Sequence, residues 1–147
     1  MPYAWQSKGN PILLPAAKGK SLNVVGLMSR KNDLFYQAHE TTFNSEKMIS
    51  FMDSFVERIV KKTVVILDNS PIHKSRKFMA KIEEWKEKDL LIFFLPPYSP
   101  ELNLIEILWR RVKYQWIPFD AYRCFQNLKE RLSYVLNNFG TKYDIIF

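Results

Sequence analysis

The sequence predicts an α/β domain, and three observations support this fold class. Residues 63–67 (TVVIL) and 90–95 (LLIFFL) have the length and the apolar composition of strands buried in a parallel sheet. Apolar residues between these segments recur at helical spacing, so strand, helix and strand form a parallel crossover unit. The 147 residues are 47% hydrophobic, which is enough for a single domain with its own core. We therefore treat residues 1–147 as one continuous domain.

The first regular element is expected to be a β-hairpin. Proline and glycine residues make Tyr3–Lys20 an irregular segment, with a short strand at Ile12–Leu14. Leu22–Met28 and Leu34–Ala38 are β-prone and are separated by a polar turn that contains Asp33. This pattern predicts two antiparallel strands.

A helix and a buried strand are expected next. Asn44 or Ser45 can cap the helix, and Thr63–Leu67 forms a strand that we expect to be buried on both faces and that ends in Asp68. The apolar residues of the helix follow the 3.6-residue period as far as Val60. They are Met48, Ile49, Met52, Phe55, Val56, Ile59 and Val60.

The second half of the crossover consists of a helix over Lys74–Lys86 and a buried strand over Leu90–Leu95. Phe78, Met79, Ile82 and Trp85 form the expected core face of that helix.

Helices are expected in the remainder of the chain. Pro96–Pro100 is a rigid loop in which Ser99 can cap a helix that begins at Pro100 and continues to Pro118. A last helix covers about Arg123–Asn138 and is closed by Gly140. The core face of the helix after Pro100 comprises Leu104, Ile105, Leu108, Val112 and Trp116.

Two carboxylates are predicted to lie at the carboxyl ends of these strands. Asp68 follows the first parallel strand directly, and ligands of open α/β sheets bind at that edge. Glu106 lies in the helix that follows the second strand, off its apolar stripe, so both carboxylates can face one crevice. Carboxylate oxygens suit Mg²⁺, which proteins hold with a few carboxylates and substrate phosphates. Solvated surface groups or partners of a helix dipole are the alternative interpretation.

Two motifs carry a family resemblance. Leu67–Ser75 reads LDNSPIHKS and Leu95–Trp109 reads LPPYSPELNLIEILW. Together with Tyr3-Ala4-Trp5 they resemble the catalytic domain of mariner-like and bacterial insertion-sequence transposases of the DDE superfamily, over nearly the whole chain. The resemblance implies a ribonuclease-H-like mixed sheet and a DNA endonuclease and strand transferase acting in DNA transposition. It also implies that Asp68 and Glu106 bind Mg²⁺ or Mn²⁺, with two ions in the complete enzyme.

The resemblance further implies that one part of the family's catalytic domain is missing. The family's first catalytic Asp lies on a central first strand, upstream of the Tyr-Ala-Trp segment, and a helix-turn-helix DNA-binding region precedes it. Asp33 is no substitute, because it lies in the predicted hairpin turn. We therefore expect a partial, N-terminally truncated domain that lacks this strand. Such a chain is either half of a split transposase, which pairs with an upstream half or with itself, or an inactive nucleic-acid-binding remnant.

Two residues that flank Asp68 have open interpretations. Asn69 either caps the following turn or orients Asp68, and His73 either contacts a phosphate or holds the loop. Further along, Glu101 is expected to stabilise a helix N-terminus and Trp109 is expected to belong to the core.

The charge of the chain predicts an anionic partner. Its 22 Lys and Arg against 15 Asp and Glu give a net charge of +7, and nucleic acid is the partner that we expect. Basic residues flank both carboxylates and are expected to contact the phosphates of transposon ends and target DNA, a solvated face being the alternative. They are Lys74, Arg76, Lys77, Arg110, Arg111 and Lys113.

The sequence predicts a cytoplasmic protein, which would be nucleoid-associated in a bacterium. Cys124 is the single cysteine and cannot form an internal disulfide, and no secretory signal pattern begins the chain. The longest apolar run, residues 90–95, is far shorter than the ~18 residues of a membrane span. We expect no membrane contact.

Overall fold

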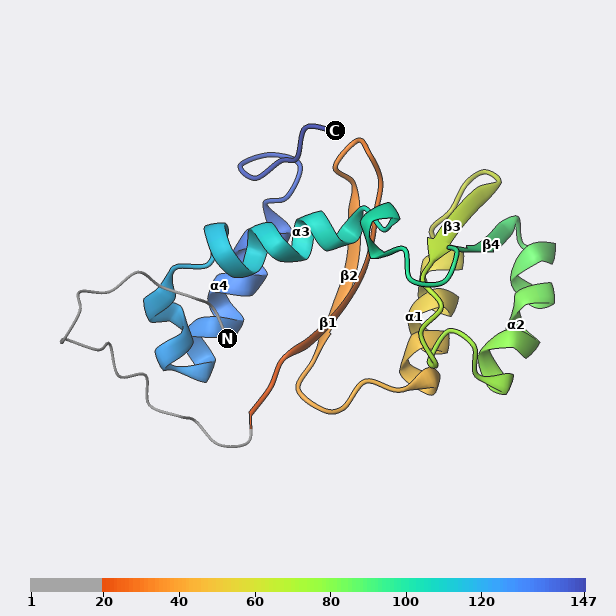
Figure 1. Cartoon of the computed structure of the whole chain (residues 1–147), viewed down its shortest axis with the longest axis horizontal. Helices are drawn as coiled ribbons and strands as arrows, with labels where there is room; N and C mark the ends of the chain where they lie inside the picture. Colours follow the sequence, from red (N-terminus) through yellow and green to blue (C-terminus); the bar gives the residue numbers. More distant parts are fainter. Residues whose placement is uncertain (1–19) are drawn as a thin grey trace.

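The structure is a computed structural model that describes residues 20–147 (Figure 1). The strand expected at Ile12–Leu14 lies outside the described residues. The strands are β1 (Asn23–Met28), β2 (Leu34–His39), β3 (Thr63–Leu67) and β4 (Leu90–Phe94). The longer helices are α1 (Ser45–Val56), α2 (Arg76–Glu87), α3 (Ile105–Arg111) and α4 (Phe125–Asn137), and the shorter helical segments are η1 (Pro100–Leu102), η2 (Val112–Trp116) and η3 (Phe119–Arg123).

The strands form two separate pairs. β1 and β2 are antiparallel, whereas β3 and β4 are parallel with Thr63 opposite Leu90 and Leu67 opposite Phe94. The expected hairpin and the expected parallel crossover are therefore both confirmed. Within the described residues no strand pairs with the free edge of β1 or of β3, so the two pairs do not join into one sheet.

Asp33 accepts hydrogen bonds from Ser29 within the hairpin turn. The Ser29 hydroxyl donates to Asp33 Oδ2 over 2.7 Å, and the backbone N–H of Ser29 donates to the Asp33 carbonyl over 3.0 Å. The prediction that Asp33 belongs to the turn is confirmed.

Helix α1 begins as expected and ends early. The Asn44 carboxamide oxygen accepts a hydrogen bond from the Lys47 N–H over 2.9 Å, which caps the first turn. The expectation of helical residues as far as Val60 is wrong, because the last residue of α1 is Val56. The chain must turn to reach Thr63, which opens β3, and Val60 is left almost fully exposed.

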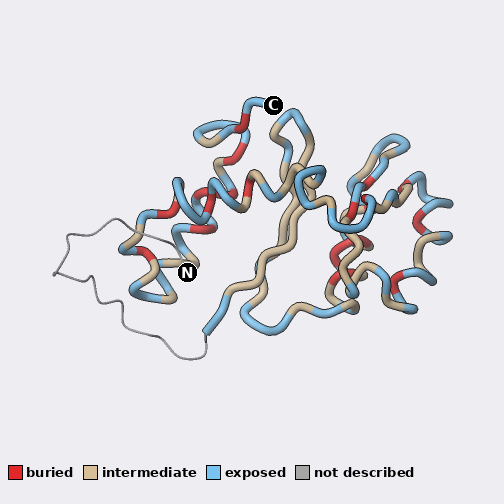
Figure 2. The backbone as a smooth tube through the Cα atoms, viewed as in Figure 1, coloured by how far each residue is buried: buried red, intermediate tan, exposed pale blue. Residues whose placement is uncertain are grey.

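Two buried clusters form the core, and each lies on one side of the hairpin (Figure 2). The α1 cluster joins α1 to both strand pairs; its buried members are Met48, Phe51, Met52, Val56, Val65, Leu67, Phe78, Trp85 and Leu90. The α4 cluster joins α3, η2 and α4 to the opposite face of the hairpin; its buried members are Leu108, Val112, Ile117, Ala121, Leu132, Val135, Leu136, Phe139 and Ile145.

The β3–β4 pair is covered on one face only. Val65 and Leu67 are buried in the α1 cluster, but Val64 and Ile66 on the other face are 56% and 53% exposed. In β4, Phe93 is 57% exposed. The expectation of strands buried on both faces is therefore wrong, because α1 and α2 pack against the same face and no described segment covers the other.

Helix α2 is capped by Ser75, whose hydroxyl oxygen accepts from the Phe78 N–H over 3.2 Å. Phe78 and Trp85 are buried as expected, whereas Met79 at the edge of the predicted core face is exposed. In the described part of the chain no helix has the length and apolarity that a membrane crossing requires.

The segment after the proline-rich loop is not one helix. Its 3₁₀ turn η1 ends at Leu102, α3 begins at Ile105, and a π-helical turn follows from Val112. The expected Ser99 cap is also absent, because the Ser99 hydroxyl donates to the Pro97 carbonyl over 3.3 Å instead. The helix predicted over about Arg123–Asn138 is confirmed as α4, which η3 directly precedes.

Candidate active site

Asp68 lies at the carboxyl end of β3, and backbone and side-chain contacts tie its loop to the neighbouring strand. The Leu95 N–H donates to the Leu67 carbonyl over 2.8 Å, which extends the parallel ladder by one bond beyond β4. The Asn69 carboxamide then donates to the Leu95 carbonyl. Asn69 therefore joins the loop after β3 to the loop after β4, a structural function that neither expected interpretation included.

One oxygen of the Asp68 carboxylate is held by two donors. Oδ1 accepts from the Ser70 N–H over 3.0 Å and lies 2.8 Å from Nδ1 of His73. The Oδ2 atom makes no hydrogen bond within residues 20–147, and the side chain is 48% exposed. Asp68 therefore offers an oriented, accessible carboxylate oxygen to a ligand.

His73 holds this loop. Its Nδ1 atom also lies 3.2 Å from the Asp68 carbonyl, and its ring packs 5.9 Å from the buried Phe78 ring. Of the two expected functions the contacts support the structural one. Because a carboxylate only accepts hydrogen bonds, Nδ1 of His73 is the donor. This contact fixes the tautomer of the imidazole and the orientation of the Asp68 carboxylate.

Glu106 is the second residue of α3, and the hairpin determines where α3 lies. A Cβ atom at Gly26 in β1 would lie only 3.2 Å from Trp109 Cζ2 and 3.3 Å from Ile105 Cδ1. Because Gly26 has no side chain, α3 can pack directly on β1. Trp109 contributes to the α4 cluster, as expected, and Glu106 is exposed on the helix surface.

The two predicted carboxylates belong to different parts of the fold. Asp68 follows β3, whereas Glu106 belongs to α3, which packs on the hairpin (Figure 1). No hydrogen bond joins them in the described part, and residues 20–147 contain no cluster of three or more His, Cys, Asp or Glu side chains suited to a metal ion. A shared metal site stays a prediction.

The predicted DNA-contacting residues are all exposed, and some of them have protein partners. Lys77 pairs with Glu46 over 2.7 Å, and this hydrogen bond raises the pKa of Lys77. Lys74 Nζ lies 4.8 Å from the centre of the Phe94 ring, and Arg111 donates to Gln115 over 2.6 Å.

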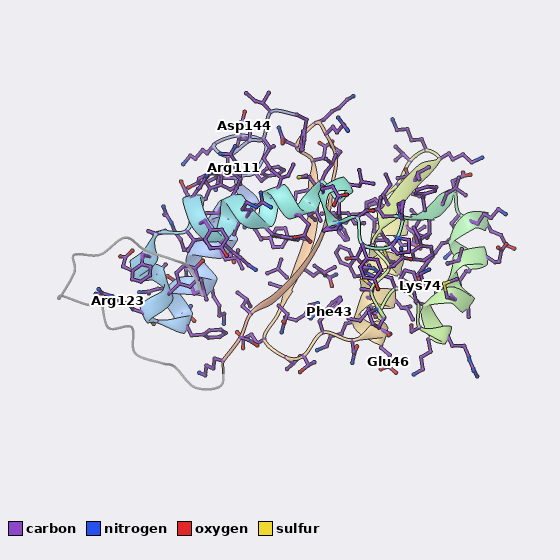
Figure 3. All side chains as sticks on the ribbon, in the orientation of Figure 1. Phe43, Glu46, Lys74, Arg111, Arg123 and Asp144 are labelled. Carbon is purple, nitrogen blue, oxygen red and sulfur yellow. The ribbon has the colours of Figure 1, made fainter. Side chains whose placement is uncertain are left out.

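The basic residues form two groups rather than one. Figure 3 shows Lys74 on the β3–β4 side and Arg111 along α3. Arg110 lies one α-helical turn after Glu106, but Lys113 falls in the π-helical turn, so the α-helical spacing from Glu106 does not extend to Lys113.

The N–H of Ser70 is a site group that sequence reasoning missed. Its hydrogen bond to Asp68 two residues earlier is an Asx turn, which the order Asp-Asn-Ser-Pro favours. The signal was present in the sequence and predicts an oriented carboxylate without reference to a family.

The comparisons with known proteins agree with the expected fold. The family described as DDE superfamily endonuclease matches residues 1–129. A chain in the crystal structure of the Mos1 strand transfer complex is similar with a TM-score of 0.61 and 15% identity, covering 95% of this chain and 45% of that chain. No curated protein matches the sequence. The ribonuclease-H-like α/β fold class is confirmed, and this chain spans less than half the length of that structural neighbour.

Proposed function

Because the chain belongs to the DDE superfamily endonucleases, we propose that it is a transposase catalytic domain in which Asp68 and Glu106 bind divalent metal ions. The observation that carries the proposal is the Asp68 carboxylate at the end of a parallel strand, with Oδ1 held by two donors and Oδ2 accessible. Carboxylate oxygens suit Mg²⁺ and Mn²⁺. The donor set therefore fits such an ion.

The residues of this chain would have different roles in the proposed reaction. Asp68 and Glu106 supply carboxylate oxygens, and His73 and Ser70 keep Asp68 oriented. Bound metal ions supply Lewis-acid stabilisation of the negative charge that develops at phosphorus and a lower pKa for the attacking hydroxyl group. The first reaction is hydrolysis of a phosphodiester at the transposon end, which frees a 3′-hydroxyl group. In the second, this hydroxyl group forms a new bond to a target phosphate, and the broken P–O bond releases a 3′-hydroxyl group of the target strand.

DNA is the proposed partner. The net charge of +7, the two exposed basic groups and the origin of the similar chain in a strand transfer complex support it. The basic residues then bind backbone phosphates and hold the scissile bond near Asp68. In a bacterial cell such a protein would be found with the nucleoid.

Metal binding tests the proposed site. Isothermal titration with Mn²⁺ should show at least about a tenfold weaker affinity for Asp68→Asn and for Glu106→Gln than for the wild type. Each change replaces a negatively charged carboxylate with a neutral carboxamide of similar size. Circular dichroism should show the same helix content and unfolding midpoint for all three proteins.

Glu101→Gln is the matched control, since Glu101 is an exposed carboxylate in η1, close to Glu106 in the sequence. Its Mn²⁺ affinity should equal that of the wild type. Equal affinities for the wild type, Asp68→Asn and Glu106→Gln would contradict the assignment of the site.

The free strand edges favour a second candidate function, in which the chain acts together with another polypeptide. Neither β1 nor β3 is paired on its outer edge within residues 20–147, and both contribute to the α1 cluster. A strand that paired with both edges would join the two pairs into the expected mixed sheet and could carry a further carboxylate.

Co-expression with an upstream transposase segment tests this second function. The pair should nick transposon-end DNA in the presence of Mg²⁺, whereas each piece alone should not. A stable complex without nicking would indicate an inactive nucleic-acid-binding protein, and failure to form a complex would contradict the pairing.

A further inference from the structure

Within residues 20–147, three residues other than glycine have a positive φ angle, and two of them have a local explanation. Asn32 has φ 64° and Asp89 has φ 65°, which Asn and Asp tolerate better than other residues. The Asn32 side chain bonds to the backbone of Ile145 over 3.2 Å at both its oxygen and its nitrogen. Asp89 follows the end of α2, where its N–H donates to the Lys86 carbonyl. Both residues therefore close a turn.

Tyr98 is the third residue, with φ 56°, and nothing in the described structure accounts for it. A bulky side chain is unfavourable in this conformation. The Tyr98 side chain is fully exposed, and within residues 20–147 its ring stacks on no aromatic group and its hydroxyl forms no hydrogen bond. Neither packing nor turn chemistry explains why an aromatic residue occupies this position.

The loop around Tyr98 is rigid. Pro96, Pro97 and Pro100 each restrict the φ angle, and the Ser99 hydroxyl bonds to the Pro97 carbonyl. A strained backbone persists only where its surroundings determine it, and such residues cluster at ligand sites. The prolines therefore restrict the backbone on both sides of Tyr98.

This loop lies next to the candidate catalytic carboxylate. Leu95, the residue before Pro96, accepts the Asn69 hydrogen bond and donates to Leu67. Asn69 directly follows Asp68, so the Tyr98 loop and the Asp68 loop are joined side by side at the carboxyl ends of β3 and β4.

We propose that Tyr98 stacks on an unpaired nucleobase of DNA bound at the Asp68 site. The inference rests on the proposed function and adds the kind of DNA that the site binds. An exposed aromatic ring in a basic protein, on a backbone that nearby prolines restrict, offers a stacking platform for any base. Inside an intact duplex the faces of a base are already stacked, so the ring contacts a base that is unpaired at a strand end or turned out of the helix.

Binding to two labelled DNA probes tests the proposal: an oligothymidylate and a duplex of the same length. By fluorescence anisotropy, Tyr98→Ala should bind the oligothymidylate about tenfold more weakly than the wild type, and Tyr98→Phe should stay within about twofold because it keeps the ring. Duplex affinity should change little. Tyr114→Ala, which removes a half-exposed tyrosine from η2, is the matched control and should leave both affinities unchanged.

A fourth variant links binding to backbone strain. Asn adopts positive φ more readily than Tyr, so Tyr98→Asn should unfold at the same temperature as the wild type or higher while binding oligothymidylate as weakly as Tyr98→Ala.

Three outcomes would overturn the stacking proposal: unchanged oligothymidylate affinity in Tyr98→Ala, equal losses for both probes, or an equal loss in Tyr98→Phe. A wild-type protein that binds neither probe would instead refute DNA binding in the proposed function. The two failures are therefore distinguishable.

Discussion

The two strand pairs have similar apolar sequences and different surroundings. In β1, Val25 packs into the α1 cluster and its neighbour Val24 packs against the α4 cluster. In β3, Val65 is buried in the α1 cluster while its neighbour Val64 is 56% exposed. An apolar strand therefore indicates which faces are suited to burial, but not which faces this chain covers. The face of β3 and β4 that no described segment covers is a surface suited to a further contact.

Helix α1 packs against both strand pairs, so a large cavity in the α1 cluster should destabilise the packing of both pairs. Phe51 is fully buried, and its ring lies 4.9 Å from that of Phe35 in β2. Phe51→Ala should lower the free energy of unfolding by about 3–5 kcal/mol, the usual cost of removing a buried aromatic ring. Urea unfolding monitored by circular dichroism measures this loss.

Leu108→Ala is the comparison in the α4 cluster, with an expected loss of about 2–5 kcal/mol. Leu108 is fully buried and lies away from β3 and β4. If Phe51→Ala cost less than about 1 kcal/mol, the α1 cluster would not join the two strand pairs as described.

The same substitution on the two faces of β3 sharpens the contrast. Val65→Thr places a hydroxyl group in the α1 cluster and should cost about 1–3 kcal/mol in the free energy of unfolding. Val64→Thr places the hydroxyl group on the exposed face and should stay within about 0.5 kcal/mol of the wild type. Thermal and urea unfolding of both variants would check the difference, and equal losses would show that the second face is covered.

The smallest expected effect concerns the surface contact between α1 and α2. The hydrogen bond and charge of Lys77 lower the pKa of Glu46 below its ordinary value of 4.5. The pair therefore contributes stability above that pH, and the contribution is lost as the pH falls through the lowered pKa of Glu46. Glu46→Gln should flatten this part of the stability profile, measured as unfolding midpoint against pH.

Glu83→Gln is the control for this titration, because Glu83 is exposed and forms no ion pair within residues 20–147. Its profile should match that of the wild type. Because both Glu46 and Lys77 are exposed, salt should also reduce the effect, and a profile that did not respond to salt would contradict the ion pair.

Local sequence signals predicted the local parts of the fold. Asn44 caps α1, β3 ends directly before Asp68 and the hairpin turn contains Asp33, because each feature depends on residues close together in the chain. The same reasoning failed for Val64 and for the helix after Pro100. Burial of Val64 depends on whether another segment covers it, and the position of α3 depends on its close packing against Gly26, which is far away in the sequence. The site shows the same division: the Asp68 loop follows from its motif, whereas its relation to Glu106 is a tertiary property.

The Gly26 contact has a consequence for regulation. It attaches α3, and with it Glu106, to the hairpin, whereas Asp68 is attached to β3. The spacing of the two acids is therefore set by the angle between two strand pairs that share packed side chains but no backbone hydrogen bond. In the proposed metal site, a partner that changed this angle would therefore change the affinity for the ion without contacting either carboxylate.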